Sequence, residues 1–448
     1  VCLIDHPAHV ELFPLESHVM HRLPLPDELP YQFQPPKLSP FWVRASRLYV
    51  SYLLRRTQVV REIDDVGLEH LKALKGKGDG VLITPNHPDL ADPAVMFMIS
   101  RRAGVPFCYM AAYQIFTGNA GLRKFILPRL GVFPVDREGA DRSAFQAGLN
   151  VLTQGKNPLV VFPEGEIYFL GDRLTPLREG AAALALAAAR KAAERGRTVW
   201  IIPTAIRYRF LENHDPLPEL HRLMDTLEAR FTWWDPCGRS IIERLYRYAE
   251  GMLALKELEY LDAPQPGTLK ERIARLKFHI LEEMEDRRLG RRSDEPVPFR
   301  VKELRRACLK ALAVPGISRE ERRTLRRNLN SLFVAIQLFS YPGDYVRENP
   351  TLERLAEIMT KFEQDALGVT NPAPRGPRRA VVKMGEPIDV RSYLGPGGRR
   401  SRAAAETLTE TLELQIQGLM DTLGPGRPLP ESALVSAPSR MPVPQPAS

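Results

Sequence analysis

Short apolar runs separated by helical stretches pass through the first half of the chain. Four runs have the length and composition of buried strands: residues 80–84, 131–135, 159–162 and 199–202. Residues 93–102 and 179–195 between them favour helix, and Gly196 is placed to end the second helix. This alternation predicts an α/β fold, in which helices flank a mostly parallel central sheet.

The second half of the chain follows a different pattern. Strand-like runs disappear through residues 213–370, and apolar residues recur at helical spacing. A strand-like run returns at residues 380–384, and a last helix is expected at residues 408–423. Residues 425–448 are rich in proline, serine and alanine, a composition that predicts a disordered tail.

Positive charge is concentrated in the helical region. The chain of 448 residues has a net charge of +9, and residues 270–327 contain 18 lysines and arginines against ten acidic residues. A basic stretch favours anionic partners, and because no nucleic-acid-binding motif is present we do not expect DNA or RNA. Two interpretations stay open: a landing surface for an anionic membrane or an acidic protein, or an ordinary solvated helical face.

The first 60 residues form an extension before the α/β pattern. Residues 1–40 are rich in proline and histidine, but the spacing of the histidines and Cys2 matches no metal site, so we expect a loose segment without metal. Residues 41–60 mix aromatic and aliphatic side chains with arginines. This pattern fits an amphipathic helix at a lipid interface and also a helix packed on its own domain.

The remaining composition bears on location. No run of 18 apolar residues and no signal-peptide pattern occurs, and the four cysteines are scattered without a CxxC pair. We therefore expect a chain in the reducing cytoplasm, peripheral to the membrane.

The first candidate for chemistry follows the strand at residues 80–84. Asn86 and His87 come directly after it, and Asp92 lies five residues beyond His87. Sites in α/β proteins lie at the carboxyl ends of parallel strands. A carboxylate at this spacing can hold one ring N–H of a histidine and leave the other nitrogen to accept a proton from an alcohol. Asp92 also precedes Pro93, which predicts a helix N-cap, a role compatible with the catalytic one.

Three more blocks end strands in the same way. Gly131 to Arg137 closes with an arginine suited to gripping a phosphate. The next block is Phe-Pro-Glu-Gly, in which Gly165 allows close backbone approach of a ligand and Glu164 can hold a hydroxyl or an arginine. The last is Ile-Ile-Pro-Thr-Ala at residues 201–205, which we interpret as a strand broken by proline.

Taken in order, the four blocks resemble the phospholipid/glycerol acyltransferase family, which includes the 1-acylglycerol-3-phosphate acyltransferases. The signature is N-H-x₄-D, then G-x₅-R, F-P-E-G and an apolar run ending in proline. The resemblance covers residues 60–210 and resumes at 378–423. It implies five segments: an N-terminal extension at 1–60, the first part of the acyltransferase domain at 61–212, a basic helical insertion at 213–377, the last strand and helix of the domain at 378–424, and a tail at 425–448.

The resemblance also implies roles for individual residues. His87 would be the general base, with Asp92 orienting it. The substrate-binding residues would be Asn86, Arg137, Glu164, Gly165, Arg173 and Arg178. Arg173 and Arg178 enter because the family usually continues F-P-E-G with T-R-S, whereas Glu166 and Ile167 stand here. One of the two arginines is expected to replace the missing one.

The implied reaction moves a fatty acyl group from acyl-CoA or acyl carrier protein to a hydroxyl of a glycerolipid-type acceptor. It needs no cofactor or metal, because a thioester is already activated. The missing arginine motivates an alternative, a non-catalytic module that keeps the fold and binds lipids or acyl chains.

Overall fold

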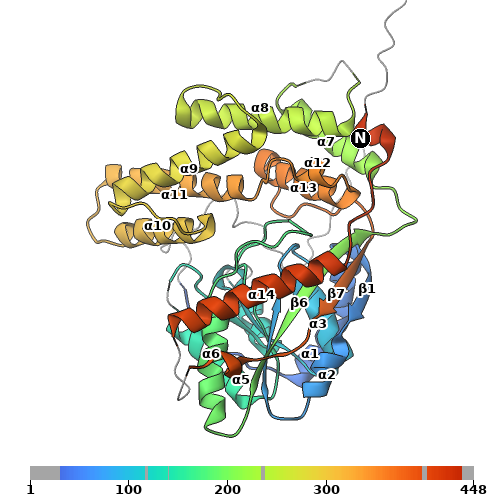
Figure 1. Ribbon diagram of the computed structural model, residues 1–448, viewed down its shortest axis with the longest axis vertical. Helices are drawn as coiled ribbons and strands as arrows, with labels where there is room; N and C mark the ends of the chain where they lie inside the picture. Colours follow the sequence, from blue (N-terminus) through green and yellow to red (C-terminus); the bar gives the residue numbers. More distant parts are fainter. Residues whose placement is uncertain (1–30, 117–119, 140, 234–237, 396–400, 436–448) are drawn as a thin grey trace, which may run out of the picture.

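The computed structural model describes residues 31–116, 120–139, 141–233, 238–395 and 401–435. The histidine-rich start and the end of the tail, on which two of the expectations fall, lie outside these ranges. The described residues form a lower α/β body and an upper layer of helices (Figure 1).

An eight-stranded sheet forms the centre of the α/β body. The strands are β1 (Val60–Val66), β2 (Gly80–Pro85), β3 (Cys108–Ala112), β4 (Val132–Val135), β5 (Leu159–Val160), β6 (Val199–Phe210), β7 (Arg378–Met384) and β8 (Ile388–Asp389). Their order is β1-β7-β6-β2-β5-β3-β4, with β8 also paired to β6. The five strands from β6 to β4 in this order run parallel, whereas β7 and β8 pair antiparallel with β6. The predicted mostly parallel sheet is confirmed.

Helices cover both faces of the sheet, each over its own apolar core. One face carries α1 (Pro40–Arg56), α2 (Leu68–Leu74), α3 (Asp92–Ala103) and α4 (Ala120–Arg129). The other carries α5 (Arg142–Gln154), α6 (Gly180–Ala193) and α14 (Arg402–Thr422), the last seen in red across the front of Figure 1. Two 3₁₀ turns, Tyr113–Phe116 and Val390–Tyr393, complete this body. Helix α1 packs on its own domain through Val43, Val50, Leu53 and Leu54.

The helical layer lies between two neighbouring strands in the chain, because β6 leads into it and β7 leads out of it. Its helices are α7 (Leu217–Arg230), α8 (Ile241–Leu261), α9 (Leu269–Arg288), α10 (Val297–Leu312), α11 (Arg319–Phe339), α12 (Tyr345–Glu348) and α13 (Leu352–Leu367). Capping boxes at Ser240 and Thr268 begin α8 and α9. Tyr168 and Leu170, in the segment after β5, and Phe210, the last residue of β6, join the apolar core of this layer. The layer therefore sits over the carboxyl edge of the sheet.

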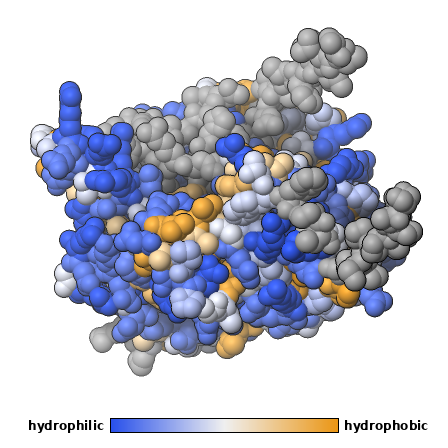
Figure 2. All heavy atoms as spheres, turned by 90° about the horizontal axis from the view of Figure 1, so that it is seen from above, coloured by the Kyte–Doolittle hydropathy of each residue, from blue (hydrophilic) through white to orange (hydrophobic). Residues whose placement is uncertain are grey.

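The outer surface of the helical layer is largely polar, and many of its charged groups are paired with one another. Seen from above, its surface is mainly hydrophilic, with apolar patches between charged groups (Figure 2). Many of its arginines are paired inside the layer, as Arg300 is with Glu285 and Arg292 with Asp286. None of the helices in the described ranges is long and apolar enough to cross a membrane.

Two expectations about local structure are wrong. Pro203 does not break its strand, because β6 continues to Phe210. Pro203 lies where β6 changes neighbour from β8 to β7, so no ladder bond needs its missing N–H. The tail is folded as far as Val435, since Leu429 N donates to Pro350 O at 2.9 Å and α15 (Glu431–Leu434) packs on α8.

Candidate active site

The His87 loop is fastened to the neighbouring strand by the residue before it. Every residue of β2 is buried, and Asn86 follows at its carboxyl end. The Asn86 amide Nδ2 donates to the Ile206 carbonyl at 3.1 Å, and its Oδ1 accepts from the Ile206 N–H at 2.6 Å. This pair of bonds completes the sheet where β2 stops. Asn86 therefore positions the loop and does not line the cavity described below.

His87 and Asp92 lie in direct contact. His87 Nδ1 is 2.7 Å from Asp92 Oδ2, and the side chains are 15% and 0% exposed. Asp92 is the first residue of α3, and Ala91 takes the N-cap position. The expectation that Asp92 caps the helix is therefore wrong. Its carboxylate turns toward His87 and accepts from the Asp89 N–H at 2.9 Å.

A second group of residues supports the Asp92 carboxylate. The Tyr208 hydroxyl donates to Asp92 Oδ1 at 2.6 Å. Burial raises the pKa of Asp92, and the hydrogen bonds from His87 and Tyr208 oppose this rise. Arg378 NH1 lies 2.6 Å from Asp89 Oδ2, and its guanidinium is 4.7 Å from the centre of the Tyr208 ring. Strands β6 and β7 thus both contribute to holding the pair.

The Phe-Pro-Glu-Gly block holds His87 from the other side. The His87 ring stacks on the Phe162 ring with centroids 4.1 Å apart. The His87 backbone N–H donates to Glu164 Oε1 at 2.6 Å, and Thr175 N–H donates to Glu164 Oε2 at 3.2 Å. Both oxygens of this buried carboxylate are engaged within the protein, and burial raises its pKa. Glu164 therefore ties two loops together behind the cavity wall, whereas Gly165 lines the cavity.

Arginines meet at Gly165. Arg137 NH1 donates to the Gly165 carbonyl at 2.5 Å, and Arg178 Nε would lie 2.4 Å from a β-carbon on Gly165. Gly165 also has a positive φ of 75°, so this position favours glycine. Arg137 and Arg178 lie 3.5 and 3.7 Å from the two carboxylate oxygens of Glu166.

The neighbouring guanidinium groups keep the Glu166 carboxyl ionised. Burial acts to raise the pKa of its carboxyl, but the guanidinium groups of Arg137, Arg178 and Arg305 outweigh burial and hold it below its usual value. Arg173 is not part of this group. It pairs with Glu348 at 2.7 Å and does not line the cavity. Of the two arginines considered as replacements, the structure brings only Arg178 to the site.

A cavity of about 1220 Å³ opens in front of His87. The α/β body and the helical layer both line it. Its apolar walls include Val50 and Leu53 of α1, Phe97 of α3, Leu127 of α4 with Leu130 just after that helix, and Phe299, Phe333 and Ile336 of the helical layer. Among the described residues, no cluster of three or more His, Cys, Asp or Glu side chains is arranged to hold a metal ion.

Sequence reasoning missed several of the supporting residues. Phe162 stands inside a recognised block, and its stacking on His87 could have been considered. Tyr208 and Arg378 carry no local signal, since they lie 116 residues from Asp92 and 289 residues from Asp89, the residues they contact. Thr175, the partner of Glu164, also carries no local sequence signal.

Comparison with known proteins finds a family match over the part of the chain that contains this site. Residues 62–207 match the family model described as Acyltransferase. The matched range starts in β1, includes the His87 loop and ends in β6, one residue before Tyr208. The search of curated proteins found no match. Residues 62–207 therefore form a domain of the glycerolipid acyltransferase family.

Proposed function

We propose that this protein transfers a fatty acyl group from an acyl thioester, carried by coenzyme A or acyl carrier protein, to a hydroxyl of a glycerolipid-type acceptor. The observation that carries the proposal is the orientation of His87. Its Nδ1 is bound to Asp92, its ring is fixed on Phe162, and the residue lines the cavity. Within the described ranges, no residue hydrogen-bonds to Nε2, so this atom is available to a substrate hydroxyl.

The reaction follows from these contacts. The acceptor hydroxyl donates to His87 Nε2 and attacks the thioester carbonyl while the imidazole takes its proton. The resulting imidazolium is stabilised by the Asp92 carboxylate. When the tetrahedral intermediate collapses, the C–S bond breaks and the leaving thiolate takes the proton from His87. General-base assistance of this kind accelerates a reaction by about 10²–10⁴-fold.

The apolar part of the cavity supports an acyl-chain substrate. Val50, Leu53 and Leu127 belong to the wall between α1 and α4, and Phe97 lies on α3. Each methylene group buried against such a wall contributes about 0.8 kcal/mol. A chain of fatty-acid length therefore gains enough to be held while its carbonyl lies beside His87.

The outer face of the same two helices supports docking on an anionic membrane. Phe41, Leu48 and Tyr52 of α1 are 69%, 85% and 51% exposed, and Leu122 and Phe125 of α4 are also exposed. The two helices are in contact, since the Trp42 and Phe125 rings lie 5.6 Å apart. Exposed Arg44, Arg55 and Arg56 of α1 supply charge for lipid phosphates. Docking on this face brings the apolar cavity wall next to the lipid.

The catalytic proposal is tested by replacing His87. We expect His87→Ala to lower thiol release from palmitoyl-CoA, in the presence of a glycerolipid acceptor, by at least about 100-fold, because general-base catalysis is lost. His279→Ala is the matched control, since His279 is exposed on α9. Full turnover by His87→Ala contradicts the assignment. A wild-type protein that binds palmitoyl-CoA but releases no thiol with any acceptor favours the non-catalytic alternative.

Membrane docking has its own test. We expect the triple variant Phe41→Ser, Leu48→Ser, Tyr52→Ser to lose most of its co-sedimentation with vesicles of phosphatidylglycerol and phosphatidylcholine, because it removes the apolar contacts of α1. Leu255→Ser with Leu258→Ser is the control, since these residues are exposed on α8. Binding by the wild type should also weaken at high salt. Equal binding by the triple variant would exclude α1 as the docking face.

A further inference from the structure

The helical layer contributes positive charge to the cavity that contains His87. Lys302, Arg305 and Arg306 of α10 line this cavity, together with Arg137 and Arg178 of the α/β body. Hereafter these five residues are called the cationic wall. Glu166 shows that the two parts meet, because Arg305 of α10 acts on its carboxylate together with Arg137, Arg178 and His87.

The members of the cationic wall differ in how their charges are used. Arg305 is paired with Glu138 at 2.7 Å, and Arg137 and Arg178 share Glu166. Lys302 has no hydrogen bond or ion pair to any residue in the described part of the chain. It is half-buried, and burial followed by the neighbouring Arg178 charge lowers its pKa. Asp136 and Glu138 act on Lys302 only from a distance, so no carboxylate in the described part of the chain contacts it directly.

The charges around the wall leave a positive excess. Besides His87, the groups that act most strongly on the charges of Lys302 and Glu166 are the five cations of the wall and the carboxylates of Asp136, Glu138 and Glu166. Five positive charges against three negative ones leave an excess of two. A phosphate monoester carries about −1.5 to −2 at neutral pH and offers three acceptor oxygens. Such a group would neutralise the wall.

We propose that α10 completes a phosphate-binding site at the cavity, in which Lys302 is the specificity-determining residue for the phosphate of a substrate. The inference rests on the proposed function and goes beyond it, because it makes the helical layer part of substrate recognition. Arg137 and Arg178 of the α/β body and Lys302 and Arg305 of α10 together form the site. Ile167, where the family motif usually has arginine, is apolar and lines the same cavity. The cations of α10 reach the same cavity from the helical layer.

The phosphate belongs either to the acceptor or to the donor, and kinetics distinguish the two. Lys302→Ala is compared with wild type using oleoyl lysophosphatidate or oleoylglycerol as acceptor, and palmitoyl-CoA or palmitoyl-N-acetylcysteamine as donor. We expect KM to rise about tenfold for the phosphate-bearing substrate that the site binds, with little change in kcat or in the KM of its phosphate-free counterpart. A charge-assisted hydrogen bond has about this worth. Lys302→Arg should restore KM. Lys310→Ala, exposed on the same helix, is the matched control and should behave as wild type.

Direct binding separates this inference from the catalytic proposal. In the His87→Ala background, calorimetric titration with the same ligands should show that Lys302→Ala weakens binding of a phosphate-bearing ligand about tenfold and leaves its neutral counterpart unchanged. If the wild-type protein has no transferase activity but this difference remains, the proposed function fails and the phosphate site stands. Equal affinities with and without Lys302, or equal losses for phosphate-bearing and neutral ligands, overturn the site.

Discussion

Asp92 is removed from solvent, yet it must be ionised to orient His87. Burial raises the pKa of its carboxyl, so the charged form depends on the groups that donate hydrogen bonds to it. These groups are the His87 ring, the Asp89 N–H and the Tyr208 hydroxyl. Losing one of them shifts the balance toward the protonated acid, which no longer stabilises an imidazolium.

Tyr208→Phe tests this dependence. Its hydroxyl lowers the pKa of Asp92, so its removal raises that pKa further. Because activity requires the ionised carboxylate, we expect the acid limb of the kcat/KM profile to move to higher pH. At neutral pH, kcat/KM should fall about tenfold, in line with about 1.5–3 kcal/mol for a hydrogen bond to a charged group. Tyr248→Phe is the control, because the buried Tyr248 hydroxyl has no hydrogen-bond partner among the described residues. An unmoved acid limb would contradict the role given to Tyr208.

Sequence reasoning reached the centre of the site but not its surroundings. His87 and Asp92 lie five residues apart, so a local pattern brings them to attention. Tyr208 and Lys302 come from a distant strand and from the helical layer, and only the folded chain places them near the cavity. A single lysine among many basic residues gives no sign that it lacks a partner.

At the scale of elements, apolar runs identified five of the strands but missed β1, β3 and the two-residue β8. Strand β1 has the sequence VREIDDV, and its exposed acidic side chains hide it from a search for apolar runs. Strand β3, CYMAA, is short and runs directly into a 3₁₀ turn. Both are held by pairing with a neighbour, β1 with β7 and β3 with β4 and β5. Local composition does not predict such pairing between distant segments of the chain.

The end of α5 offers a test of element packing near β2. Gly155 ends α5 with a φ of 61°, and a β-carbon there would lie 1.9 Å from the Gly78 carbonyl oxygen. Gly196 has a similar φ of 65° but no neighbouring atom within 4 Å. We expect Gly196→Ala to reduce the free energy of unfolding by about 1 kcal/mol, from backbone strain alone.

Gly155→Ala should cost several kcal/mol more, because the chain leading into β2 must move. The comparison is made by urea unfolding of both variants and wild type. An equal loss of unfolding free energy in the two variants would mean that the chain at Gly78 moves aside at little cost. Only the left-handed backbone conformation would then matter.

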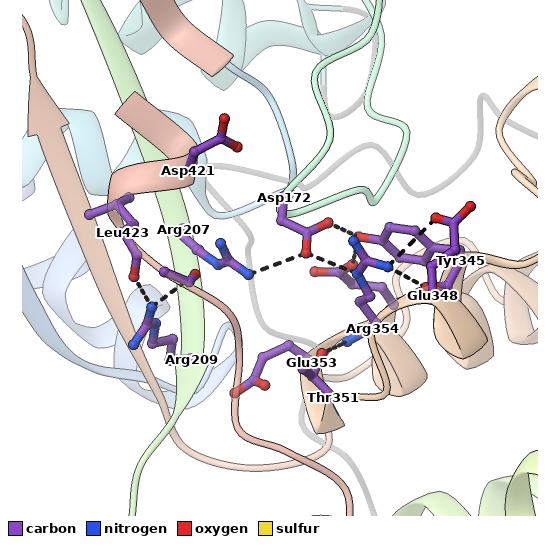
Figure 3. Close-up of polar contacts among 12 residues, drawn as sticks. Asp172, Arg207, Arg209, Tyr345, Glu348, Thr351, Glu353, Arg354, Asp421 and Leu423 are labelled. Atoms are coloured by element: carbon purple, nitrogen blue, oxygen red, sulfur yellow. Dashed lines mark hydrogen bonds and ion pairs between the residues drawn. The ribbon is translucent and has the colours of Figure 1, made fainter. Parts of the chain in front are cut away.

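At the scale of the whole molecule, a polar network joins the helical layer to the α/β body. Asp172 Oδ2 lies 3.3 Å from Arg207 of β6 and 2.9 Å from Arg354 of α13, and its Oδ1 accepts from the Tyr345 hydroxyl at 2.8 Å (Figure 3). Because both bodies line the cavity, this network fixes one wall of the site relative to the other. The helical character of the layer could be anticipated from the sequence, but its attachment could not, since it depends on single charged residues far apart in the chain.

Glu357 of α13 makes the attachment of the layer sensitive to pH. Its Oε2 lies 2.7 Å from the Tyr345 hydroxyl oxygen, and burial followed by the nearby Asp172 charge raises its pKa to about 8. A carboxyl whose pKa is raised in the folded state contributes stability that is fully present below its ordinary pKa near 4.5. That contribution is lost as pH rises through about 8, because ionisation is easier in the unfolded chain.

Glu357→Gln removes this titration, so its stability relative to wild type should improve steadily from pH 5 to pH 8, by up to about 1.4 kcal/mol per pH unit. Thermal midpoints of both proteins at pH 5.5, 7 and 8.5 measure the change. The test is how the difference between the two midpoints varies with pH, because the altered contact with Tyr345 adds only a constant difference. Lys361, one turn along α13, also has a pKa lowered by burial to about 7, and because the Glu357 charge acts on it, the variant reports the titration of the two groups together. Glu283→Gln, an exposed change on α9, should run parallel to wild type. If Glu357→Gln also runs parallel, Glu357 is not the group that couples the helical layer to pH.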